Sequence, residues 1–257
     1  MGHVPAGAAA SDGRPDMTAV QAPYVTAFTG EHVALNLAIA RHAGAMTKAR
    51  LSYRDPVDED WMFGALWARQ ATNRVGDPDF RALHTLRQRE CMLGRLCQVC
   101  QGSAADPSSG RLWWVWPAPV AASSAVLSKP PTCRACIPKA IAACPSLRGS
   151  AHVYTSDDYE PRGVVGHVFS DVGGVLRMQE GLLPGRLWEI PLDAFRRLEY
   201  TLARALIVRT WGLRREHIPR PGGPTSRCNA DAPTIDSPAS AALGMGSGSR
   251  ASAPSGM

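Results

Sequence analysis

The sequence predicts an α+β fold: a β-rich single domain with a zinc-knuckle finger of treble-clef or zinc-ribbon type and a helix near its C-terminus. Short segments rich in Val, Thr, Tyr and Trp recur along the middle of the chain, separated by Gly, Pro and Asp, as is typical of β proteins. Two Cys-x-x-Cys pairs in this middle part are separated by 32 residues. An apolar fraction of 45% provides enough hydrophobic surface for a buried core.

The two ends of the chain differ in composition from the middle. Residues 1–20 are rich in Gly, Ala and Pro, and residues 219–257 contain six Pro, six Gly and seven Ser. Segments of this kind bury too little apolar surface to offset the loss of chain entropy. We therefore expect a disordered N-terminal segment at 1–20, a zinc-stapled α+β domain at 21–218 and a disordered Gly/Pro/Ser-rich tail at 219–257.

The first half of the central domain combines extended segments with one helical stretch. β-Branched and aromatic residues predict strands within residues 23–39 and at 51–54. The aromatic cluster at 60–68 is expected to pack in the core. Residues 80–95 have apolar positions near helical spacing, which predicts a helix or a strand–helix join before the first cysteine pair.

The second half is predicted to be richer in strands. Residues 111–116 hold three Trp and one Val and end at Pro117, which favours a strand. Pro138 suits the first turn of a short helix at 137–144, and Pro145 ends that helix. The remaining expected strands are 151–155, 163–169, 175–178 and 187–190.

The last element of the domain is expected to be a helix at 193–211. Asp193 is a suitable N-cap, and Gly212 can end the helix. Apolar residues recur along it at helical spacing, namely Phe195, Leu198, Leu202 and Leu206. The arginines of this segment would form a solvated face.

The cysteine pairs carry the clearest chemical signal. Cys97 and Cys100 form one pair, Cys133 and Cys136 form the other, and four thiolates at this spacing can ligate zinc in a tetrahedron. The second pair precedes the short helix at 137–144, and the amides at a helix start favour nearby negative charge. The order of knuckle, strand, knuckle and helix resembles a treble clef or a zinc ribbon. We therefore predict zinc as the cofactor and these four cysteines as its ligands.

Other roles for the cysteines stay open. The four thiols could instead lie reduced in a small core, or serve a redox reaction, although two knuckles match that reaction poorly. Cys91 and Cys144 flank the four and are expected to be small buried apolar residues, but either could replace a ligand. Cys228 lies in the predicted tail and is given no role.

The sequence also bears on where the protein is found. The N-terminus lacks a basic stretch followed by an apolar one, and the chain contains no run of 18 or more apolar residues. We therefore expect a cytoplasmic protein without a membrane span, whose thiols stay reduced. The odd count of seven cysteines fits poorly with complete disulfide pairing. The oligomeric state is left open.

The net charge of +6 is concentrated in the middle of the chain. Residues 81–148 contain nine Lys and Arg against Glu90 and Asp106. This excess either neutralises the thiolates on an ordinary solvated surface or faces an anionic partner. The tryptophans of 111–116 could stack bases, although strand alternation places Trp113 opposite the other two and one face should be core. The predicted partner is nucleic acid, with a protein as the alternative.

Motifs for enzymatic chemistry are few. No His is followed two positions later by Glu, as zinc deaminases require, and residues 101–132 contain no His for an HNH-type nuclease. Phosphate loops, dinucleotide-binding glycines and a nucleophile elbow are also missing from the sequence. We therefore expect a non-enzymatic binding or regulatory module. The alternative is an enzyme with a site around residues 152–167, which would use His152, Asp157 and His167.

A set of motifs spans most of residues 21–211. These motifs are DWMFG at 60–64, CQVC at 97–100, PPTCRAC at 130–136, CPSL at 144–147, PLDAF at 191–195 and LEY at 198–200. In them the chain resembles a group of uncharacterised proteins of high-GC actinobacteria. The resemblance implies one continuous domain. It implies no activity, because none is established for that group.

Overall fold

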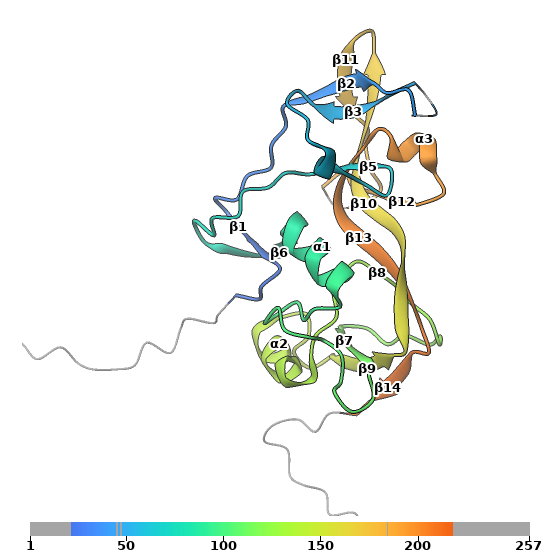
Figure 1. Ribbon diagram of the computed structural model, residues 1–257. Helices are drawn as coiled ribbons and strands as arrows, with labels where there is room; N and C mark the ends of the chain where they lie inside the picture. Colours follow the sequence, from blue (N-terminus) through green and yellow to red (C-terminus); the bar gives the residue numbers. More distant parts are fainter. Residues whose placement is uncertain (1–21, 45, 47, 184, 218–257) are drawn as a thin grey trace, which may run out of the picture. The chain divides into compact units, whose positions relative to one another are not determined.

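The computed structural model describes residues 22–44, 46, 48–183 and 185–217. The end segments predicted to be disordered, 1–20 and 219–257, lie outside the described residues, and so does Cys228. The described part is rich in strands and has few helices, which confirms the β-rich character predicted from the sequence (Figure 1).

Two long antiparallel strands, β10 (Asp158–Val172) and β13 (Thr201–Trp211), form the centre of the largest sheet (Figure 1). This sheet has seven strands in the order β11-β10-β13-β5-β4, and in it β12 also pairs with β10 and β8 with β13. Among the described strands of this sheet, only β13 and β5 run parallel to each other. The other five strands are β4 (Trp61–Met62), β5 (Ala65–Trp67), β8 (Val126–Leu127), β11 (Val175–Met178) and β12 (Trp188–Pro191).

Three smaller antiparallel sheets surround this centre. The order β14-β9-β7 joins β14 (Arg214–Glu216), β9 (His152–Ser156) and β7 (Leu112–Trp116). The two remaining sheets pair β1 (Thr26–Phe28) with β6 (Pro78–Leu83), and β2 (Leu37–Arg41) with β3 (Ala49–Tyr53). The helices are α1 (Thr85–Gly94), α2 (Ile137–Ala143), α3 (Phe195–Leu198) and the 3-10 turns η1 (Asp58–Asp60) and η2 (Arg134–Cys136).

The prediction of a helix at 193–211 is wrong. Only the beginning of this segment is helical, as α3, and residues 201–211 form the strand β13. Leu202 and Leu206 pack in different apolar clusters, because the register of β13 against β10 shifts between Ala203 and Ala205 and places the two side chains on opposite faces of the strand. The strand is buried on both faces in the middle of the sheet, and its apolar residues therefore do not alternate with polar ones. The β-branched Ile207 and Val208 favour a strand over a helix.

The other predicted elements lie close to those observed. The strand–helix join predicted at 80–95 is found as β6 followed by α1, and the helix predicted at 137–144 as α2. The extended segment 23–39 holds β1 and the start of β2, with Gly30 between them. A Cβ atom on Gly30 would lie 2.7 Å from the carbonyl oxygen of Val75, so this crossing of two chain segments requires glycine.

One buried side chain, that of Gln88, ties α1 to the central sheet. Its Oε1 accepts a hydrogen bond from the backbone N–H of Leu206 at 2.9 Å, and its Nε2 donates to the carbonyl of Leu206 at 3.0 Å. The same Nε2 donates to the carbonyl of Ser128 at 2.9 Å, next to β8. Gln88 thus satisfies backbone groups that β13 leaves unpaired in the protein interior.

We expect Gln88→Leu to lower the free energy of unfolding by about 2–3 kcal/mol, because it leaves these backbone groups of Leu206 and Ser128 buried without partners. Urea denaturation measures the loss. The matched control is Gln179→Leu, since Gln179 is exposed and its substitution should change stability by less than about 0.5 kcal/mol. Equal losses in the two variants would show that the Gln88 bridge contributes nothing specific.

Candidate metal centre

The first knuckle is a tight turn between α1 and β7. Leu96 and Ser103 form an isolated antiparallel bridge at its base, and the N–H of Cys97 donates to the carbonyl of Gly102 at 2.7 Å. Inside the turn, the N–H of Val99 donates to Cys97 Sγ at 3.4 Å. A backbone N–H that donates to a sulfur stabilises negative charge on that sulfur.

The second knuckle leads directly into a helix. The turn η2 holds Cys136, whose N–H donates to the carbonyl of Cys133 at 2.9 Å, and α2 begins at the next residue. Pro138 occupies the first turn of α2, as predicted, because its missing N–H is not needed there. The short helix therefore starts at the sulfur pair.

Hydrogen bonds that do not involve the sulfurs also hold the two knuckles together. The N–H of Gln98 donates to the carbonyl of Pro131 at 2.9 Å, and Gln98 Nε2 donates to Thr132 Oγ1 at 2.7 Å. The N–H of Thr132 in turn donates to the carbonyl of Trp113 on β7. Sequence reasoning missed Gln98 and Thr132. Their positions within or beside the Cys-x-x-Cys motifs were the available signal.

The structure brings the four predicted cysteines together. One Sγ atom from each of Cys97, Cys100, Cys133 and Cys136 lies within 4.8 Å of all the others, and the Cys100 and Cys133 sulfurs are 3.9 Å apart. A tetrahedron with zinc–sulfur bonds of ~2.3 Å has sulfur–sulfur edges of about 3.8 Å. The donor set and its spacing therefore fit a tetrahedral metal ion. Among the described residues, no other group of three or more His, Cys, Asp or Glu has such spacing.

The electrostatics of the cluster also favour a cation at its centre. Burial raises the pKa of Cys97 to about 11, and burial together with a hydrogen bond to Cys133 raises the pKa of Cys136 further. Burial acts on Cys100 in the same direction, but hydrogen bonds from the Gly102 N–H and the neighbouring thiols lower its pKa overall. Four gathered sulfurs disfavour thiolates in one another, and a divalent cation reverses that preference.

The remaining described cysteines lie outside the cluster. Cys91 is fully buried in α1, its thiol lies 3.8 Å from the carbonyl of Cys97, and burial raises its pKa to about 12. Cys144 ends α2 and is half-buried against the core around β7. Neither belongs to the four-sulfur group, which agrees with their predicted role as small packing residues.

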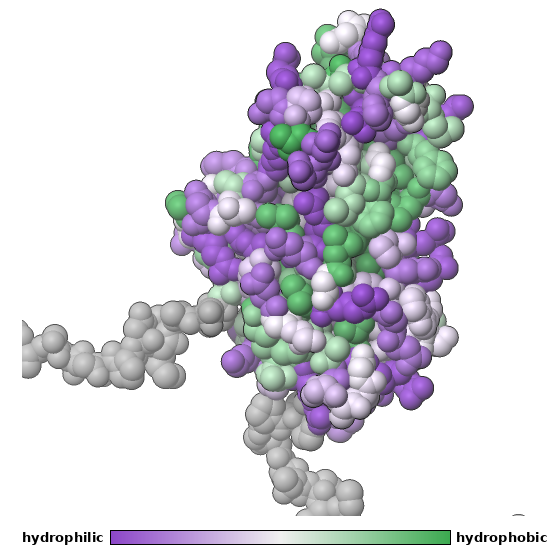
Figure 2. All heavy atoms as spheres, viewed as in Figure 1, coloured by the Kyte–Doolittle hydropathy of each residue, from purple (hydrophilic) through white to green (hydrophobic). Residues whose placement is uncertain are grey.

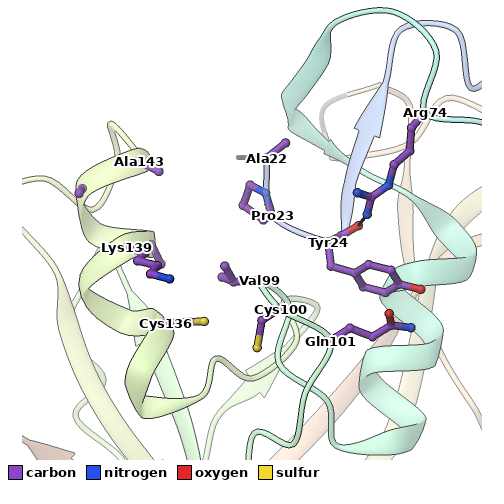
Figure 3. A pocket seen from close by; sticks show the side chains of 12 residues that line it. Ala22, Pro23, Tyr24, Arg74, Val99, Cys100, Gln101, Cys136, Lys139 and Ala143 are labelled. Atoms are coloured by element: carbon purple, nitrogen blue, oxygen red, sulfur yellow. Dashed lines mark hydrogen bonds between the residues drawn. The ribbon is translucent and has the colours of Figure 1, made fainter. Parts of the chain in front are cut away.

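A cavity of about 520 Å³ lies beside the knuckles (Figure 3). Both knuckles line it, through Cys100 and Cys136, together with the start of the described chain and α2. The N–H of Tyr24 donates to the carbonyl of Val99, which holds that chain segment against the first knuckle. Two cationic side chains, Arg74 and Lys139, also line the cavity. The four-sulfur cluster therefore borders a hollow with a basic rim.

The basic segment 81–148 is partly neutralised by carboxylates from elsewhere in the chain. Arg87 pairs with Glu31, Arg95 with Asp158, and Arg111 with Asp157. The cations of the segment that are exposed and lack an ion pair within the described residues are Arg81, Lys129, Arg134, Lys139 and Arg148. The sequence has no Asp or Glu from residue 107 to 156, so most of these cations stand in an acid-free stretch.

The tryptophan strand is core rather than surface. Trp113 and Trp114 are 7% and 1% exposed, and Trp116 is half-buried. Trp114 and Trp116 stack on one face of β7 with ring centroids 5.9 Å apart, and Trp113 packs with Ile137 of α2 on the other. The predicted alternation is confirmed, and burial leaves Trp113 and Trp114 inaccessible for base stacking.

The alternative enzyme site around residues 152–167 does not form. Asp157 forms an ion pair with Arg111. His152, on the β14-β9-β7 sheet, accepts a hydrogen bond from Arg215 at 3.3 Å. His167 lies nine residues along β10 from Asp158, which at a rise of ~3.3 Å per residue separates them by roughly 30 Å. The three proposed groups therefore share no site.

Comparison with known proteins adds no relative: no family model, no curated protein and no solved structure matches this chain. Within the described ranges, no helix is long and apolar enough to cross a membrane. Figure 2 shows apolar groups between hydrophilic ones over the visible face of the described part.

Proposed function

We propose that the chain is a zinc-binding module in which Cys97, Cys100, Cys133 and Cys136 hold one structural zinc ion. Four thiolates complete the tetrahedral coordination that structural zinc sites have, and catalytic zinc sites keep one position open for water. The ion would fix the two knuckles, β7 and α2 as one unit. The mutual spacing of the four sulfurs, within 4.8 Å, supports this assignment.

We further propose that this unit binds nucleic acid. One observation carries the proposal: residues 129–148, which contain the second knuckle and α2, hold four cations and no carboxylate. All four, Lys129, Arg134, Lys139 and Arg148, are exposed. Because Trp113 and Trp114 of β7 are buried, most contacts would go to phosphates and carry little sequence preference. A protein partner is the second candidate, and the 520 Å³ cavity between the knuckles and Tyr24 favours it.

The test is binding of the full chain to a labelled DNA duplex and a single-stranded RNA over a salt series. We expect log K to fall against log salt with a slope of up to about −3 to −4, since four cations can neutralise up to four phosphates. Lys139→Glu with Arg148→Glu should weaken binding by about tenfold or more. Arg177→Glu with Arg196→Glu, two exposed substitutions outside the basic segment, is the charge-matched control. Absence of binding at low salt would overturn the nucleic-acid proposal and leave the zinc assignment intact.

A further inference from the structure

A second cavity, of about 390 Å³, lies on the central sheet and shares no lining residue with the cavity beside the knuckles. Most of its wall is apolar. The apolar lining residues come from β2 and the segment before it, and from β10, β11 and β13. They are Val33, Leu35, Leu37, Phe169, Leu176, Met178 and Leu202. Leu35 is 68% exposed and Met178 is 40% exposed, so the cavity opens to solvent near these residues.

Strand register explains why these side chains meet. Phe169 lies opposite Met178, and His167 lies opposite Leu202, so the alternate residues of three neighbouring strands share one face. Arg204 reaches the same face from an irregular position. Val165 pairs with Ala205 and Gly166 with Ala203, which leaves Arg204 as the extra residue of a bulge. Bulges redirect side chains, and this one brings a guanidinium to an otherwise apolar wall.

The two polar groups of the cavity, Arg204 and His167, lack acidic partners. Arg204 Nε donates to Thr85 Oγ1 at 3.2 Å, and no carboxylate of the described residues pairs with this guanidinium. His167 Nδ1 is buried and has no hydrogen-bond partner. Burial lowers the pKa of Arg204, with only the Tyr53 phenol acting against it. Burial and then Arg204 lower the pKa of His167, and they outweigh a hydrogen bond to the Arg186 carbonyl.

Other half-buried arginines of this protein are stabilised in two ways: Arg89 and Arg197 have no ion pair within the described residues and lie over the rings of Trp67 and Trp188, whereas others have an anion beside them. Arg69, for example, is paired with Asp60 at 2.6 Å and with Asp55 at 3.2 Å. A desolvated cation without a counter-ion is costly, and the usual compensation is an anion. The cavity therefore offers a cationic end, at Arg204 with the His167 ring beside it, and a long apolar wall. These are the two halves of a site for an amphiphilic anion.

We propose that this cavity binds an amphiphilic monocarboxylate of medium chain length. The carboxylate would accept hydrogen bonds from the Arg204 guanidinium, and its charge would favour protonation of His167, whose Nδ1–H would then donate to it as well. The hydrocarbon chain would lie along Phe169 and Leu176 toward Leu35. A polyphosphate or a sugar fits less well, because the remaining walls offer no polar side chains to replace its water. The site is independent of the metal centre and of nucleic-acid binding.

The experiment titrates decanoate, below its self-association concentration, into the full chain by isothermal titration calorimetry. We expect saturable binding with one site per chain. Decanol, which keeps the chain and lacks the charge, should bind at least about tenfold more weakly. Arg204→Met should weaken decanoate binding by about tenfold or more and leave decanol unaffected. Arg177→Met, on the opposite face of β11, should bind decanoate as the wild type does.

A second variant keeps the proposal testable if Arg204→Met does not fold. Leu35→Glu changes an exposed residue at the cavity mouth, so the fold should persist while the added carboxylate repels decanoate. Decanoate binding that is undetectable, that equals decanol binding, or that is unchanged in both Arg204→Met and Leu35→Glu would each overturn the proposal. Equal affinity for the two ligands would mean an apolar groove without an anion site.

Discussion

Cys133→Ser is expected to unfold the region around both knuckles, which includes β7, η2 and α2. A zinc ion held by four thiolates contributes on the order of 10 kcal/mol in small zinc domains at neutral pH, and a lost ligand forfeits much of this. Thermal unfolding followed by circular dichroism and tryptophan fluorescence would report the change, because Trp113 and Trp114 lie in this region. A strong chelator should have the same effect on the wild type.

Cys144→Ser is the matched control for this substitution. It makes the same chemical change in a half-buried cysteine that lies outside the sulfur group. We expect a small loss of stability and unchanged sensitivity to chelator. If Cys133→Ser and Cys144→Ser lose equal stability, and if neither responds to chelator differently from the wild type, the sulfur cluster has no metal-dependent role.

Arg87→Met is expected to lower the free energy of unfolding by about 3–5 kcal/mol, because it leaves the buried carboxylate of Glu31 without its counter-charge. The two side chains form an ion pair, and both residues are less than 5% exposed. Arg87 Nη1 also donates to the carbonyl of Thr26 at 2.6 Å, which links α1 to β1. Urea denaturation at neutral pH measures the loss.

The double variant Arg87→Met with Glu31→Gln tests this explanation. It removes both charges, so it should recover at least about 1 kcal/mol relative to Arg87→Met alone. A double variant that is less stable than Arg87→Met would show that the cost comes from packing and not from the unpaired carboxylate.

The same pair predicts an acid dependence. Burial would raise the pKa of Glu31, but hydrogen bonds from the N–H groups of Phe28 and Arg74, with the charge of Arg87, lower it overall. A lowered pKa in the folded state means that the unfolded chain binds the proton more tightly. The stabilisation is therefore complete above the unfolded-state pKa of a glutamate and is lost as pH falls below it. The double variant should lack this part of the pH dependence.

Local patterns in the sequence were sufficient to predict the four-cysteine cluster and several strands. The four candidate ligands, Cys97, Cys100, Cys133 and Cys136, can be identified from the sequence, because a zinc knuckle has two cysteines at a short, fixed spacing. The helix at 137–144 follows from Pro138 and Pro145, which set its ends. These features depend on a few neighbouring residues, and so the sequence alone carries them.

Features that depend on distant pairing were not predictable in the same way. β13 was mistaken for a helix because burial of both faces hides the period of two, and its neighbours β10 and β5 come from other parts of the chain. The positive charge that residues 81–148 expose is smaller than the sequence predicts. Glu31, Asp157 and Asp158 lie outside this segment in the sequence, and they form ion pairs with three of its arginines. The position of Arg204 in its cavity depends on a bulge in β13, and the local sequence does not predict this bulge.

Native mass spectrometry of the purified full chain tests the central claim most directly. The folded protein should carry the mass of one zinc ion, lose it on acid denaturation, and lack it in Cys97→Ser. A folded chain with no bound metal, or one whose zinc persists when Cys97 is replaced, would contradict the assignment of the four sulfurs as a zinc site.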